Sequence, residues 1–219
     1  TDVHLNQNSG SLTGFTSVAV TASGVTRFTG DVTTSGSFTT DAAGSTQFDA
    51  VSLDVGSADF ADNVVIATSL TIDADTNVDF GGSLTGQDGT QSLNLASVAD
   101  ATFTGAVSGL SSITITSTGD VDFQNTVTGT AAGQLDIVSA QNVTFADTLT
   151  TFALVDITNS TSLRFSGDVS GLDVLSVEGA GTLFFNTANV TVDAFDLTND
   201  VVLEQSLQLS VMGDVNFLG

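Results

Sequence analysis

Phenylalanine recurs at a nearly constant interval along most of this chain. From Phe60 to Phe185 the Phe-to-Phe spacings are 20, 23, 20, 22, 20 and 20 residues, and each Phe closes a short strand-like triplet such as Val121-Asp122-Phe123. Self-similarity at a fixed period of this length is the sequence signature of a repeat architecture. The predicted column consists of Phe28, Phe60, Phe80, Phe103, Phe123, Phe145, Phe165 and Phe185.

Two further apolar columns keep the same register. One apolar residue follows each Phe by four positions, and an apolar pair lies ten and eight positions before the next Phe. The unit therefore holds two apolar strand segments joined by turns. The single positions are Val32, Val64, Leu84, Val107, Val127, Leu149 and Val169, and the pairs are Val18/Val20, Leu70/Ile72, Leu93/Leu95, Ile113/Ile115, Leu135/Ile137, Val155/Ile157 and Leu175/Val177.

These units predict an all-β fold built as a β-solenoid. Runs such as Ser112-Ile113-Thr114-Ile115-Thr116 alternate with the period of two that is typical of half-buried strands. One unit cannot bury its own apolar face, but stacked units align Phe on Phe and Val on Val inside a continuous core. About ten rungs, each rising about 4.8 Å, predict a rod about 50 Å long. The alternative is a β-sandwich, although sandwiches do not keep one residue type at one register through eight units.

The chain is expected to form a single solenoid domain over residues 1–219, with one irregularity. Phe28 and Phe60 are 32 residues apart, which exceeds the usual interval. The surplus around Thr33–Asp49 predicts either a short extra rung or a protruding hairpin at residues 33–49.

Several units resemble the repeats of very large bacterial exoproteins. Val121–Val127, and Arg164–Leu172 leading to Leu175–Val177, are similar to the degenerate VxFxGxVxG…LxV repeats of filamentous-haemagglutinin-like and autotransporter-passenger-like proteins. This resemblance implies a right-handed parallel β-helix, export to the cell surface, and a structural or adhesive role. It supplies no catalytic residues, and neither a secretion domain nor a barrel anchor is recognisable.

Composition excludes several classes of function. The chain carries 25 Asp and Glu against 2 Lys and Arg, for a formal net charge of −23. Nucleic acids and anionic membranes bind clustered cations, so neither is expected as a partner. No apolar run approaches the length of a membrane span, and the lack of Cys removes thiolate metal sites and cysteine nucleophiles. The single His4, with no Lys, Trp or Tyr, is a poor basis for catalysis, so no enzyme and no catalytic residue is predicted.

One acidic run suggests a calcium site. Asp73, Asp75, Asn77 and Asp79 occupy alternate positions, which an extended chain would direct to one side. Carboxylate and amide oxygens suit Ca²⁺, although the run lacks the glycine and the distal glutamate of a calcium loop. The alternative is a solvated turn that leads into Val78 and Phe80. Calcium is therefore the one cofactor considered.

The predicted function is that of a non-enzymatic extracellular structural protein, a stiff solenoid of a cell-surface fibre, sheath or adhesin. Both ends of the chain read as parts of a repeat without polar caps, so the expected partners are identical subunits stacked end to end, or neighbouring repeats of a longer chain. The second hypothesis is an adhesin module that binds surface glycans or a receptor through the segment 33–49. A polysaccharide-degrading β-helix enzyme is the third.

Overall fold

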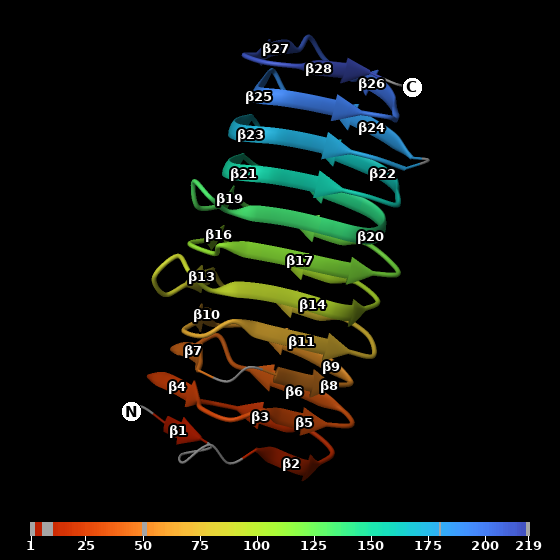
Figure 1. Ribbon diagram of the computed structural model, residues 1–219. Helices are drawn as coiled ribbons and strands as arrows, with labels where there is room; N and C mark the ends of the chain where they lie inside the picture. Colours follow the sequence, from red (N-terminus) through yellow and green to blue (C-terminus); the bar gives the residue numbers. More distant parts are fainter. Residues whose placement is uncertain (1–2, 6–10, 50–51, 180, 218–219) are drawn as a thin grey trace.

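The computed structural model describes residues 3–5, 11–49, 52–179 and 181–217. These residues form 28 strands and no helix, and every pairing between the strands is parallel (Figure 1). The chain winds through about ten turns that stack into a rod, and each turn places one strand segment on each of three faces. The prediction of a parallel β-solenoid is confirmed, and the antiparallel sandwich is wrong.

Each face is a ladder of short strands. The first face holds β3 (Val18–Val20), β6 (Ser37–Thr40), β9 (Ser57–Phe60), β12 (Val78–Phe80), β15 (Ala101–Phe103), β18 (Val121–Phe123), the second part of β20 (Gln134–Phe145), β22 (Ser160–Phe165), β24 (Thr182–Phe185) and β26 (Asp200–Leu203). The second face holds β1 (Val3–Leu5), β4 (Val25–Phe28), β7 (Ser45–Phe48), β10 (Asn63–Ile66), β13 (Leu84–Gly86), β16 (Val107–Ser108), β19 (Val127–Thr128), the first parts of β21 (Leu149–Ile157), β23 (Val169–Val177) and β25 (Asn189–Leu197), and β27 (Gln208–Val211). The third face holds β2 (Leu12–Phe15), β5 (Val32–Thr34), β8 (Ser52–Val55), β11 (Leu70–Ala74), β14 (Ser92–Val98), β17 (Ser112–Ser117), the first part of β20, the second parts of β21, β23 and β25, and β28 (Val215–Phe217).

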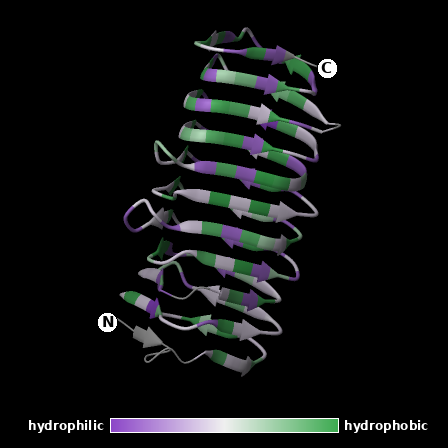
Figure 2. Ribbon diagram, viewed as in Figure 1, coloured by the Kyte–Doolittle hydropathy of each residue, from purple (hydrophilic) through white to green (hydrophobic). Residues whose placement is uncertain are grey.

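Alternation along the strands separates the interior from the surface (Figure 2). In β18, Val121 and Phe123 are buried while Asp122 between them is partly exposed. Because register partners carry the same kind of residue, apolar side chains form continuous columns inside the rod. This placement removes apolar area from water along its whole length, which is the main favourable term in folding.

Phenylalanine forms the longest of these columns, on the first face. Seven rings from Phe60 to Phe185 stack in succession, with centroids 4.5 to 5.6 Å apart and interplanar angles of 3 to 17°. All seven side chains are fully buried. Offset-stacked aromatic pairs add about 0.5–1.5 kcal/mol each beyond the area they bury. The column therefore joins neighbouring turns along most of the rod.

Phe28 does not lie in that column. It is in register with Phe48 on the second face, and the two rings stack at 5.4 Å. On the first face, the positions below Phe60 are taken by Thr40 and then Val20. Phe28 and Phe60 therefore lie on different faces, so the 32 residues between them do not measure one repeat.

The segment 33–49 consequently belongs to the regular ladder. Its strands β6 and β7 pair in parallel with strands of the turns on either side. The column assignment also changes for three valines of the first turns. Val18 and Val20 pair with Phe38 and Thr40 on the first face, and Val32 pairs with Leu53 on the third face. Surplus residues lie instead at the corner between the second and third faces, in the connections from β13 to β14 and from β19 to β20, which project in Figure 1.

That corner needs a left-handed backbone conformation. Gly109 and Gly171 have φ of 66° and 61°, and Thr151, which stands one turn before Gly171, has φ of 63°. A residue with a side chain pays an energetic penalty of about 1–2 kcal/mol in this region, whereas glycine does not. Thr151 is therefore a locally strained position at this corner.

Replacing Thr151 with glycine should raise the free energy of unfolding by about 0.5–1 kcal/mol, because the relieved strain exceeds the extra freedom that glycine gives the unfolded chain. Chemical denaturation of the Thr151→Gly variant measures this difference. The reciprocal Gly171→Thr variant should lose stability, and a loss in both variants would contradict the strain at Thr151.

Phe123→Ala should lower the free energy of unfolding by about 3–5 kcal/mol, because it opens a cavity inside a dry column. Thr102→Ala serves as the control, since Thr102 lies at the neighbouring outward column position on β15 and should change stability by less than about 0.5 kcal/mol. Equal effects of the two substitutions on the denaturation midpoint would mean that the column is misassigned.

Candidate functional site: the C-terminal end of the solenoid

The four residues of the predicted calcium site are spread around a corner of the solenoid. Asp73 lies on β11 of the third face and Asp79 on β12 of the first face, while Asp75 and Asn77 are exposed in the turn between them. Among the described residues, no three His, Cys, Asp or Glu side chains gather closely enough to hold a metal ion. The alternation assumed from sequence ends where the chain turns, so calcium binding stays a prediction without a preformed site.

A second acidic pair lies on the third face. Asp136 and Asp156 are register partners on adjacent turns, and burial together with the charge of Asp156 raises the pKa of the Asp136 carboxyl. The buried Oδ1 of Asp156 has no hydrogen-bond partner in the described part of the chain. Two partly buried like charges on neighbouring strands repel each other, so this pair destabilises the fold locally.

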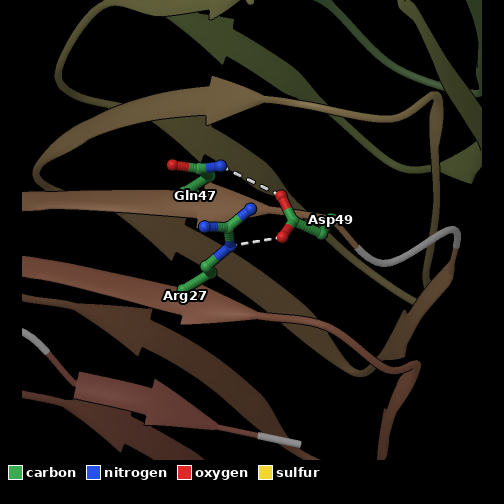
Figure 3. Close-up of polar contacts among 3 residues, drawn as sticks. All are labelled: Arg27, Gln47 and Asp49. Atoms are coloured by element: carbon green, nitrogen blue, oxygen red, sulfur yellow. Dashed lines mark hydrogen bonds and ion pairs between the residues drawn. The ribbon is translucent and has the colours of Figure 1, made fainter. Parts of the chain in front are cut away.

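Both arginines are engaged in ion pairs across turns. The Arg27 Nε on β4 donates to Asp49 Oδ2 after β7, and Gln47 Nε2 donates to Asp49 Oδ1 at 3.0 Å (Figure 3). Neither Lys nor any other Arg occurs in the sequence. Each arginine on the described surface therefore has an acidic partner within the chain.

Arg164 connects the strands of the last turns through an ion pair and a contact with an aromatic ring. It lies on β22 of the first face, its guanidinium stands 5.0 Å from the Phe184 ring on the next strand β24, and it reaches Glu204 directly after β26. Both guanidinium NH groups donate to the Glu204 carboxylate, one of them at 2.9 Å. This pairing lowers the pKa of Glu204 and raises that of Arg164. One side chain thus spans three consecutive strands.

The turn fastened by Arg164 exposes apolar surface. Leu203 on β26 is 56% exposed, whereas its register partners Phe185 and Phe165 in the turns below are buried. Met212 after β27 is 76% exposed, at a position that also faces outward in the preceding turns. Large exposed apolar groups on one contiguous face mark an interaction surface more often than scattered ones do. A hollow of about 390 Å³ opens there, and it is lined by Phe185, Phe195, Val201, Leu203, Leu207 and Leu209.

Strand edges are open at the same end. Within the described residues, β26 pairs only with β24, while β27 and β28 pair only with β25. Their outer N–H and C=O groups therefore have no strand beside them, and such edges readily accept another parallel strand. At the opposite end, β2 and β3 likewise pair on one side only, and Phe15 is 51% exposed. Sequence reasoning had indicated the uncapped ends, but it missed both arginine pairs.

The second face carries an uncharged column. From β13 to β27 its central outward position always holds Thr or Ser, and no carboxylate enters it. Sequence spacing did not reveal this column, because insertions at the corner change the intervals. Its members are Thr85, Ser108, Thr128, Thr150, Ser170, Thr191 and Ser210.

Comparisons with known proteins assign the chain neither to a family nor to a fold class. No family model matches it, and no curated protein and no solved structure matches it either. No helix among the described residues is long and apolar enough to cross a membrane. The parallel β-solenoid, with an apolar and edge-exposing C-terminal turn, is the class that the structure itself defines.

Arg164→Gln should loosen β26 selectively, because it removes the bidentate pair with Glu204 and the contact with Phe184. We expect a several-fold increase in amide hydrogen exchange across Asp200–Leu203, with β17 unchanged. High salt should bring the wild type closer to the variant. Because the folded pKa of Glu204 is lowered, the contribution of the pair is present at neutral pH and is lost as the pH falls through that pKa.

Arg27→Gln is the matched control, since it makes the same chemical change near the other end. It should leave exchange at β26 unaltered. If both variants changed β26 equally, or if neither did, Arg164 would not be the residue that fastens the last turn.

Proposed function

We propose that this protein is a non-enzymatic structural rod of a cell-surface fibre, sheath or adhesin, and that it extends by stacking head to tail on identical copies. The observation that carries the proposal is the C-terminal end, where an apolar hollow and three open parallel edges occur together. The extracellular setting is supported by the resemblance of the repeat units to those of bacterial exoproteins.

Parallel winding makes the two ends of the rod complementary. All strands run in one direction on each face, so the upper edge of one rod and the lower edge of another can pair in the parallel sense that the interior uses throughout. The same columns reach both ends: Val201 and Leu203 continue the first-face columns that begin at Val18 and Val20. A contact between unlike ends is heterologous and does not close, so it produces a filament.

The net negative charge of the rods opposes the end-to-end contact and makes it depend on salt. A net charge of −23 makes rods repel at low ionic strength, which keeps them dispersed and limits lateral association. Salt screens exposed charges over distances of about 10 Å at 0.1 M, so end-to-end contact should strengthen as salt is added. Divalent cations would act in the same direction by bridging carboxylates on separate rods.

A second candidate is a glycan-binding module. The uncharged hydroxyl column of the second face favours it, because neutral sugars are bound by hydroxyl and amide groups without a need for cations. The segment 33–49, to which sequence reasoning assigned specificity, forms ordinary rungs and offers no inserted loop. Dispersed rods under all conditions would favour this second role.

Electron microscopy of the purified chain tests the leading proposal, at low and high salt and with and without Ca²⁺. Filaments with an axial repeat of about 50 Å, the length of about ten turns, are expected at high salt. Leu203→Asp should abolish them, because it places a charge in the apolar hollow. The control is Val138→Asp, an apolar position on the side of the rod that is 37% exposed. Dispersed particles in every condition, or filaments in the Leu203→Asp variant, would contradict head-to-tail stacking.

A further inference from the structure

One carboxylate lies inside the rod near its N-terminal end. Asp62, in the turn between β9 and β10, is only 5% exposed, whereas most acidic residues of this chain lie at the surface. The equivalent corner of the next two turns is occupied by Gly82 and Gly105. The backbone carbonyl of Asp62 lies against Gly82 so closely that a Cβ added there would be 2.2 Å from it. The backbone of Asp62 is thus packed directly against the adjacent turn.

Two buried threonines hold this carboxylate. Thr40 Oγ1 donates to Asp62 Oδ1 at 2.6 Å, and Thr46 Oγ1 donates to Oδ2 at 2.9 Å. Thr40 occupies the column position that Phe60 fills one turn later, and Thr46 occupies the position that Val64 fills. Both therefore replace residues that are apolar in the following turns. The three side chains form one polar cluster that ties β6 and β7 to the next turn.

The surroundings of the cluster disfavour its charge. Burial raises the pKa of the Asp62 carboxyl, the hydrogen bonds from Thr40, Thr46 and the Asp62 backbone lower it, and the charge of Asp41 in the turn after β6 raises it again. The net direction is upward. Asp41 is the one charged group acting on it, while the Gly82 and Ser83 side of the next turn is uncharged. Among the described residues no cation acts on the carboxylate, so its ionised form depends on the two hydroxyl donors and the backbone of Asp62.

We propose that the Thr40–Asp62–Thr46 cluster is a pH-dependent latch, which holds the N-terminal turns together when Asp62 is protonated and loosens them when it is ionised. A neutral carboxyl can donate one hydrogen bond and accept another without a desolvated charge. The ionised form keeps both acceptors but places an unpaired negative charge in a dry interior, near Asp41.

Linkage fixes the direction of the effect. The pKa of Asp62 is higher in the folded protein than in the unfolded chain. At pH values between these two pKa values, the folded state therefore holds the proton while the unfolded state has released it. The latch therefore contributes fully below the unfolded pKa, and its contribution is lost as the pH rises through the folded pKa. The loosening is expected to be local, since the hydrogen bonds of the cluster join β6, β7 and the turn between β9 and β10.

Hydrogen exchange across a pH series tests this proposal, combined with carbon NMR titration of the Asp62 carboxyl. Relative to β17 and β20, the protection of β6, β7 and β10 should increase as the pH falls through the Asp62 pKa. Asp62→Asn should remove this pH dependence. Asp59→Asn should retain it, because Asp59 lies outward on the neighbouring strand β9. An Asp62 that titrates like an exposed aspartate, or an unchanged pH dependence in Asp62→Asn, would overturn the latch.

Two further variants distinguish a latch from a purely structural cluster. Asp41→Asn removes the repelling charge and should move the pH midpoint of β6–β10 protection downward. Thr46→Val removes a donor to the carboxylate and should move that midpoint upward. Shifts in these opposite directions support the proposal even if Asp62→Asn fails to fold, whereas midpoints that do not move would contradict it.

Discussion

The fold depends on in-register stacking of one turn upon the next. A turn of about twenty residues cannot enclose a core of its own, so its apolar side chains leave water only when equivalent side chains lie directly above and below them. Parallel pairing fixes this register through backbone hydrogen bonds, and the Phe column from Phe60 to Phe185 adds aromatic contacts at every step. Burying one phenylalanine contributes about 1.5–3 kcal/mol, so each turn is stabilised mainly by its neighbours. The last described turn has a described strand on one side only, and several of its apolar side chains are exposed.

Sequence alone predicted the architecture correctly where phenylalanine repeats in one column of one face. The column assignment was wrong where phenylalanine occurs on a second face. Seven phenylalanines were placed correctly, but Phe28 belongs to the second face, because nothing in the spacing separates two faces that use the same residue. The calcium hypothesis assumed that Asp73 to Asp79 stay extended, whereas the chain turns a corner between β11 and β12. The Asp62 cluster was missed because its partners Thr40 and Thr46 lie 22 and 16 residues away, and only three-dimensional stacking brings them together.

Charge gives the rod its second property. Carboxylates occupy turns and outward strand positions, and both arginines form ion pairs with acidic residues of the same chain, near opposite ends of the rod. A surface of this kind repels its own copies along its sides, while its ends present apolar side chains and open backbone edges. The proposed head-to-tail stacking rests on this difference between the sides and the ends. For the buried Asp62 the main cost of ionisation is a different one, because burial, before the charge of Asp41, raises the pKa of its carboxyl.

Distances between spin labels along one outward column test the stacking most directly. Asp59, Thr144 and Val202 lie in a single column of the first face, and the register places Thr144 four turns and Val202 seven turns above Asp59. At about 4.8 Å per turn, double electron–electron resonance should give backbone separations of about 19 Å for Asp59–Thr144 and about 34 Å for Asp59–Val202. Separations that increase in proportion to the number of turns are what the solenoid requires. Equal or shorter distances for the more distant pair would contradict it.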